Sequence, residues 1–196
     1  IYDKNLIEKP KLGPIPNFDD SKLNDPLVDV INELTAETTL NDKLDRIINS
    51  YEGAQKSIEE KENIVSLVQQ KEKFYTENTE LQIKTHYNQR DTIAINCMGF
   101  SAIININEVA SNTAKYVTLL VRYFRGYISF NSSPMYFPGD EPKQTSSIEY
   151  KFDLDKTENV VWKSKTETIN SEKLVNEVYS NIITNLKNFK SKNFRK

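Results

Sequence analysis

The last quarter of the chain carries the pattern that most constrains the fold. Apolar and polar residues alternate from Ile148 to Leu154, as in a strand with one buried face. Residues 153–159 are rich in Asp, Asn and Thr, which favour turns, and Val160 to Trp162 opens a second strand. Helical spacing then runs from about Ser171 to Phe189. We therefore predict a β-hairpin under a closing amphipathic helix. The side chains expected at their contact are Tyr150, Phe152, Leu154, Trp162, Leu174, Val178, Ile182 and Leu186.

The N-terminal segment is rich in proline. Residues 1–26 hold four of the seven prolines. Proline lacks an amide donor and disfavours helix at the residue before it, so we predict an extended tether over residues 1–20. A proline segment that binds a partner is the alternative, but Pro10 and Pro14 do not make the regular PxxP spacing of such ligands.

Helical signals occupy residues 21–80. Asp25 can cap a helix and Pro26 suits its first turn, after which apolar residues recur at helical spacing at Leu27, Val30, Ile31 and Leu34. We predict a second, short helix over residues 41–51, ended by Gly53, and a third over residues 54–76. The charged face of the third helix is typical of a solvated surface, with a coiled-coil partner as the alternative.

Strand signals occupy residues 81–169. The strands are interrupted at Met98 and Gly99, and residues 116–130 form the longest β-prone run. Apolar residues on both faces of that run predict a central strand covered on both sides, at least at its start. Proline and glycine predict a loop over residues 131–147, and the closing helix takes residues 170–190.

This order predicts an α+β fold. N-terminal helices are followed by a mostly antiparallel sheet with a C-terminal helix packed on one face. A chain of 196 residues with 37% hydrophobic residues suits a single α+β domain, which we place at residues 21–196.

The charge balance gives no sign of a nucleic-acid or membrane partner. Charged residues make up 28% of the chain and the net charge is −2. The basic tail after Lys187 also suits the negative end of a helix dipole. No run approaches the roughly 20 apolar residues that span a bilayer. We expect no nucleic acid as a partner and no transmembrane span.

Residues that could carry chemistry are few. His86 is the only histidine and Cys97 the only cysteine, so they are the only thiol–imidazole pair available, and a buried structural thiol is the simpler interpretation. Oxygen side chains from Asp153 to Asn159 resemble the start of a calcium loop, but Glu158 stands where glycine is required. A β-turn explains the same residues through local bonds from side chain to backbone, and we favour it over calcium. We predict no catalytic residues, no metal and no cofactor.

An aromatic segment offers the best candidate surface. It could be core plus the rim of a loop, or an exposed surface for a ligand or protein, because tyrosine gives large contact area at low entropic cost. Because side chains alternate along a strand, the rings of this segment cannot all be buried on one face of the sheet. Part of the segment therefore needs a second layer over it, from the N-terminal helices, a partner subunit or a ligand. The candidate ligand or partner surface is Tyr123, Tyr127, Phe130, Tyr136 and Phe137.

The C-terminal part has a family resemblance. The turn with Asp155, Lys156, Thr157 and Trp162, the helix from Glu172 to Leu186, and the apolar run from Gly99 to Ile104 resemble small bacterial cell-envelope lipoproteins of poorly known function. The resemblance covers the second half at most, and residues 21–76 depart from the strand-first opening expected of that family. It implies no catalytic residues.

These observations leave three classes of function open. The first is a non-enzymatic cell-envelope or secreted binding module, periplasmic or anchored in the outer membrane, whose partner is a protein or an envelope component. Because the sequence begins at Ile1, a cleaved signal peptide or lipidated cysteine upstream would fit. The alternatives are a cytosolic interaction protein of the immunity type and a small enzyme with an unrecognised site, for which carboxylates are the candidate groups.

Overall fold

The structure, a computed structural model, describes residues 26–88, 91–107, 112–130 and 141–193. The predicted tether over residues 1–20 lies outside these ranges. Contacts divide the chain into two compact units, Ile1–Thr39 and Leu40–Lys196. The described elements are α1 (Pro26–Ile48), α2 (Tyr51–Asn78), β1 (Ile83–Asn88), β2 (Thr92–Cys97), β3 (Phe100–Asn107), β4 (Thr118–Arg125), β5 (Lys143–Leu154), β6 (Val160–Lys163), β7 (Thr168–Ile169) and α3 (Ser171–Asn193).

The strands form one antiparallel sheet in chain order, from β1 to β7. This sheet between N-terminal helices and a C-terminal helix confirms the predicted α+β fold. The interruption predicted at Met98 and Gly99 is a two-residue hairpin turn, in which both residues have positive φ, 47° and 87°. Glycine adopts this conformation without the steric cost that a side chain brings.

The turn between β5 and β6 is built around one carboxylate. Asp155 Oδ1 accepts hydrogen bonds from the Thr157 hydroxyl at 2.7 Å and from the amides of Thr157 and Asn159. These bonds, the Thr157 hydroxyl first, hold the pKa of Asp155 below its usual value. The oxygen side chains of this segment are therefore used to close the turn, as the β-turn interpretation predicts.

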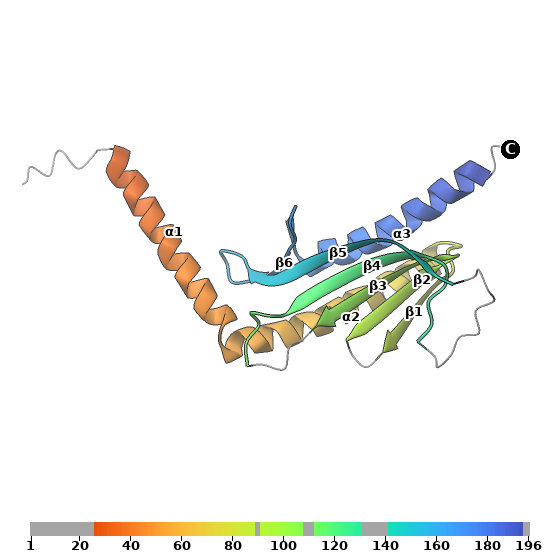
Figure 1. The fold of residues 1–196 in the computed structure, drawn as a ribbon, viewed down its shortest axis with the longest axis horizontal. Helices are drawn as coiled ribbons and strands as arrows, with labels where there is room; N and C mark the ends of the chain where they lie inside the picture. Colours follow the sequence, from red (N-terminus) through yellow and green to blue (C-terminus); the bar gives the residue numbers. More distant parts are fainter. Residues whose placement is uncertain (1–25, 89–90, 108–111, 131–140, 194–196) are drawn as a thin grey trace, which may run out of the picture. The chain divides into compact units, whose positions relative to one another are not determined.

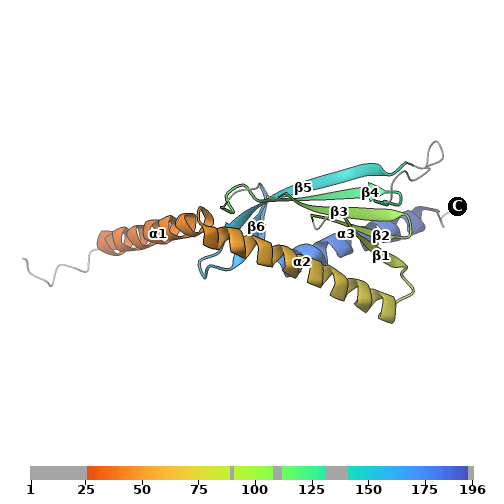
Figure 2. The same cartoon turned by 90° about the horizontal axis from the view of Figure 1, so that it is seen from below.

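Both α2 and α3 cover the same face of the sheet (Figures 1 and 2). The predicted contact of hairpin and closing helix is confirmed, because all eight of its side chains are buried in one core. Trp162 is fully buried, and its Nε1 donates to Ser171 Oγ at 2.8 Å, at the start of α3. The Tyr179 hydroxyl donates to the Val68 carbonyl at 3.0 Å and so joins α3 to α2.

The helical region differs from the prediction at Gly53. The expected separate helix over residues 41–51 is the end of a continuous α1, and Gly53 lies inside α2 rather than ending a helix. A Cβ at Gly53 would lie 2.5 Å from the Ile47 carbonyl oxygen and 2.9 Å from the Ile48 Cα. The glycine therefore permits the close packing of α2 against the end of α1.

Two strand predictions also need correction. The expected loop over residues 131–147 is too long, because β5 already begins at Lys143, where it pairs with Arg125 of β4. The central strand β4 is buried only on its helix side, at Leu119, Val121 and Tyr123. Its other face is half-buried, since α2 and α3 both lie on the same side.

Candidate functional site

The face of the sheet opposite α2 and α3, here called the open face, gathers the residues of interest. Strand alternation places His86 of β1, Ala94 of β2, Ile103 of β3 and Arg122 of β4 side by side on it. Leu120 and Phe124 flank Arg122 along β4 and are half-buried.

A short segment after β4, residues 126–130, crosses this face and is here called the strap. The Asn96 side chain holds it as a neighbouring strand would: its amide donates to the Ile128 carbonyl at 2.9 Å, and its Oδ1 accepts from the Ile128 amide at 2.8 Å. The Ser101 hydroxyl, also buried, lies within hydrogen-bond distance of Asn96 Oδ1 and of the Gly126 carbonyl. The strap buries a small second cluster of Ala94, Ile103 and Ile128, against which Phe124 and Phe130 pack.

Gly126 starts the strap with a backbone that requires glycine. Its φ is 122°, and a Cβ there would lie 2.7 Å from the Cα of Pro142. The path of the strap across the sheet therefore depends on this residue.

The predicted aromatic surface is divided by the structure. Tyr123 is 5% exposed and belongs to the helix-side core, so it is not part of a surface, and burial raises its pKa to about 12. Tyr127 is 45% exposed, and its hydroxyl lies 2.7 Å from His86 Nε2. Phe130 packs half-buried against the second cluster. Tyr136 and Phe137 lie outside the described residues. The second cover that sequence alternation requires is supplied in part by the strap itself.

Arg122 is the residue that the sequence analysis missed. Its Nε–H is buried and has no hydrogen-bond acceptor in the part of the chain that the structure describes. The signal was available in the alternation of residues 116–130, because Arg122 stands between Leu120 and Phe124 on the face predicted to be apolar. A charged side chain between two apolar ones on a strand face is unusual, because a buried cation needs a hydrogen-bond acceptor.

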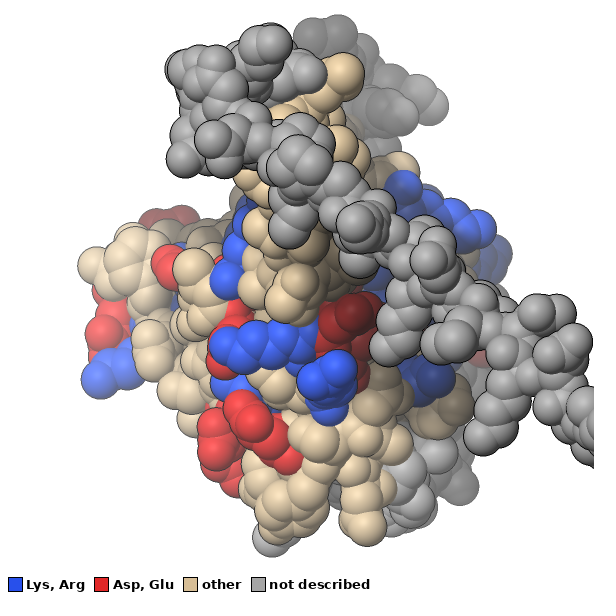
Figure 3. Space-filling model, turned by 90° about the vertical axis from the view of Figure 1, so that its left-hand side faces the viewer, with Lys and Arg blue, Asp and Glu red and all other residues tan. Residues whose placement is uncertain are grey.

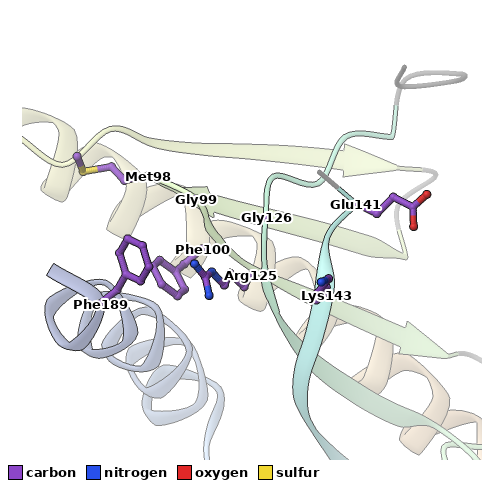
Figure 4. Close-up of a pocket in the computed structure, with 8 residues that line it drawn as sticks. All are labelled: Met98, Gly99, Phe100, Arg125, Gly126, Glu141, Lys143 and Phe189. Atoms are coloured by element: carbon purple, nitrogen blue, oxygen red, sulfur yellow. The ribbon is translucent and has the colours of Figure 1, made fainter. Parts of the chain in front are cut away.

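A hollow of about 480 Å³ lies at one end of the sheet (Figure 4). The Arg125 guanidinium stands 4.7 Å from the centre of the Phe189 ring of α3, and Phe100 meets the same ring edge-on. Lys143 lies opposite Arg125 on β5, while the Glu141 side chain points away from the rings. The lining thus offers two cations, one carboxylate and two aromatic rings.

A second hollow, of about 340 Å³, is lined by residues of α2, β6 and the start of α3. It contains two carboxylates, Glu60 and Glu172, the residue type that the enzyme alternative would use. Its Ser171 hydroxyl is already the acceptor for the Trp162 indole.

The thiol and the imidazole lie on opposite faces of the sheet. Cys97 belongs to the helix-side core, where burial raises the pKa of its thiol, whereas His86 lies on the open face beside Tyr127. The two therefore do not form a catalytic pair. Within the described residues, no group of three or more His, Cys, Asp or Glu is placed to hold a metal.

Charges of both signs are mixed on one face of the molecule. On the face shown in Figure 3, Lys and Arg side chains stand next to Asp and Glu side chains. Lys43, for example, pairs with Glu158. In the described ranges, no helix is both long and apolar enough to cross a membrane.

No protein-family model matches the chain, and no curated protein or solved structure matches it either. The resemblance to envelope lipoproteins therefore stays a prediction.

Proposed function

We propose that the protein is a non-enzymatic binding module that takes a partner protein on the open face of its sheet. The observation that carries this proposal is the buried Nε–H of Arg122, which has no acceptor in the described residues. A buried donor without an acceptor costs about 1–3 kcal/mol. A partner that displaces the side chains covering Arg122 and sets a carboxylate or main-chain carbonyl against its Nε–H would remove that cost on binding.

The surroundings of Arg122 support a protein as the partner. Leu120 and Phe124 provide apolar surface on either side, and Tyr127 adds an exposed ring on the strap. Arginine and aromatic side chains are the types that dominate binding energy at protein interfaces. The net charge of −2, and the mixed charges on the face shown in Figure 3, support the expectation that the partner is not a nucleic acid.

The proposed location is the cell envelope or the outside of the cell, with a lipid anchor upstream of Ile1 as the proposed attachment. The support is the resemblance carried by residues 155–162 and 172–186. Fractionation of cells that express the complete native gene tests this location. Recovery in the soluble cytosol would favour the immunity-type alternative.

The substitution Arg122→Met tests the proposed function. If Arg122 serves binding, the substitution should not lower the free energy of unfolding of the free protein; if Arg122 is structural, it should lower it. Methionine keeps the apolar stem and removes the donor without an acceptor. We expect the free energy of unfolding to stay equal or rise by about 1 kcal/mol, and the affinity for the partner to fall about tenfold or more. The partner is first trapped from native cells with a photo-reactive residue at position 127, and both quantities are then measured with purified proteins.

The matched control is Lys187→Met, an exposed cation on α3, which should bind the trapped partner as tightly as the unchanged protein. If Arg122→Met binds that partner with unchanged affinity, or if it destabilises the free protein, then Arg122 is structural and the proposal is wrong.

A further inference from the structure

The first unit contains an exposed apolar stripe on α1. Its members are spaced as on one face of a helix and are between 50% and 66% exposed: Leu27, Val30, Ile31 and Leu34. Contiguous exposed apolar surface on a helix marks an interaction site, because isolated exposed side chains are common but a continuous stripe is not. We call this set of four residues the α1 stripe. It shares no residue with the surface around Arg122.

One flank of the α1 stripe is acidic. Glu33 and Glu37, one turn apart, form an acidic ridge along one side of the stripe, beyond Val30, whereas Asp29 lies nearly opposite the stripe on the helix. All three are exposed. Residues 27–39 contain no lysine or arginine, so the ridge is not neutralised by a cation within that stretch.

The opposite flank is uncharged. The hydroxyls of Thr35 and Thr39 on this flank, and of Thr38 on the line of the stripe itself, each donate to the carbonyl of the residue four positions earlier, at 2.8–2.9 Å. Since these hydroxyls already have acceptors in the helix, this flank presents mostly methyl groups. The face as a whole is an apolar stripe with negative charge along one side only.

We propose that the α1 stripe docks an amphipathic helix of another protein that carries basic residues beside its own apolar stripe. Apolar residues of that helix would bury Ile31 and Leu34, and its Lys or Arg side chains would pair with the acidic ridge, as flanking charges do in paired helices. Charge complementarity of this kind selects the partner and its orientation.

Two other occupants fit this face less well. If two copies paired antiparallel through the stripe, the acidic ridge of one copy would face the acidic ridge of the other. If they paired parallel, each acidic ridge would face the threonine flank of the other copy, and no ion pair would form. Helices that lie on anionic membranes carry Lys and Arg on their polar face, which is the opposite of Asp29, Glu33 and Glu37.

Two synthetic peptides and the full 196-residue chain test this proposal. Both peptides have about three heptads with leucine at a and d; one carries lysine at e and g and the other glutamate. In fluorescence anisotropy the lysine peptide should bind about tenfold or more tightly than the glutamate peptide. The double substitution Ile31→Ser with Leu34→Ser should abolish this binding although it changes no charge, which separates docking from non-specific attraction of a basic peptide.

Two further variants sharpen the result. Ile58→Ser makes the same substitution at an exposed isoleucine of α2 and should leave binding unchanged. Glu33→Lys with Glu37→Lys keeps the apolar stripe intact and should shift the preference toward the glutamate peptide, so the test holds even if the serine variant frays the helix. Circular dichroism measures the helix content of each variant.

The contrary outcomes are specific. Equal binding of the two peptides, or binding that survives the serine substitutions, would show that the α1 stripe does not select a basic helix. A dimer in sedimentation equilibrium that Ile31→Ser dissociates would assign the face to a second copy. Binding to phosphatidylserine-containing vesicles that Ile31→Ser abolishes would assign it to lipid. Either result would overturn the proposal.

Discussion

At the scale of single residues, Gly53 shows how packing overrides local preference. Glycine is a poor helix residue, and its propensity alone predicts the end of a helix. In the structure Gly53 is buried in the first turn of α2, with the Ile47 carbonyl oxygen 2.5 Å from where a Cβ would stand. The missing side chain is what lets the two helices turn sharply against one another.

Gly53→Ala should therefore destabilise the protein although alanine is the better helix former. Propensity favours alanine by about 1 kcal/mol, whereas the clash with Ile47 and Ile48 should lower the free energy of unfolding by about 1–3 kcal/mol net. Urea denaturation measures the change. Glu59→Ala, at an exposed position of the same helix, should stay within about 0.5 kcal/mol. A more stable Gly53→Ala protein would contradict the role given to this corner.

At the scale of elements, the edge strand β1 is protected by a helix side chain. The Thr85 amide points outward from the sheet and donates to Glu72 Oε1 of α2 at 3.1 Å, and the Thr85 hydroxyl bonds to the other carboxylate oxygen. An edge strand with open amides is a template for pairing with another chain. Glu72 accepts the hydrogen bond of one of those amides, so that this amide is not available to another chain.

Glu72→Ala should weaken the edge in two ways. Loss of the charged acceptor should lower the free energy of unfolding by about 1–2 kcal/mol and speed hydrogen exchange at the Thr85 amide. The opened edge should also associate at high concentration, as measured by sedimentation velocity. In the control Glu77→Ala, which loses only a surface contact with Lys73 at 3.9 Å, both effects should be absent. A monomeric Glu72→Ala protein with unchanged exchange would rule out this role.

The elements also show what the sequence could and could not predict. The hairpin and helix around Trp162 were predictable, because alternation and helical spacing are local patterns that match the burial. The start of β5 was not, since Pro138, Gly139 and Pro142 favour a loop while pairing with β4 extends the strand back to Lys143. The strap was also beyond prediction, because the side-chain bonds from Asn96 to Ile128 join residues 32 positions apart. The open face of the candidate site depends on such distant contacts.

At the scale of the whole molecule, the main core is built entirely from the second unit. The first residue that contributes to it is Leu44, or Leu40 if the partly buried side chains around it are included. Residues 26–39 add no side chain to either described core cluster. The stability of the sheet and its helices should therefore be independent of them.

A chain that begins at Leu40 should fold by itself. We expect its Tm to lie within about 4 °C of that of the full chain, because no core contact is removed. Differential scanning calorimetry measures both transitions. A fall of more than about 10 °C would mean that residues 1–39 stabilise the second unit through contacts outside its core.

The order of the strands has a consequence for how the chain assembles. Each strand pairs with its neighbour in sequence, so the sheet can grow hairpin by hairpin as residues 83–169 are synthesised. The bond from Tyr179 to Val68, by contrast, joins residues 111 positions apart. During synthesis the side of α2 that contacts α3 must therefore stay uncovered until α3, the last helix, leaves the ribosome. A nascent chain that stalls before Ser171 would carry a paired sheet whose apolar face is covered only in part, by α2, and such partly covered intermediates are prone to aggregate.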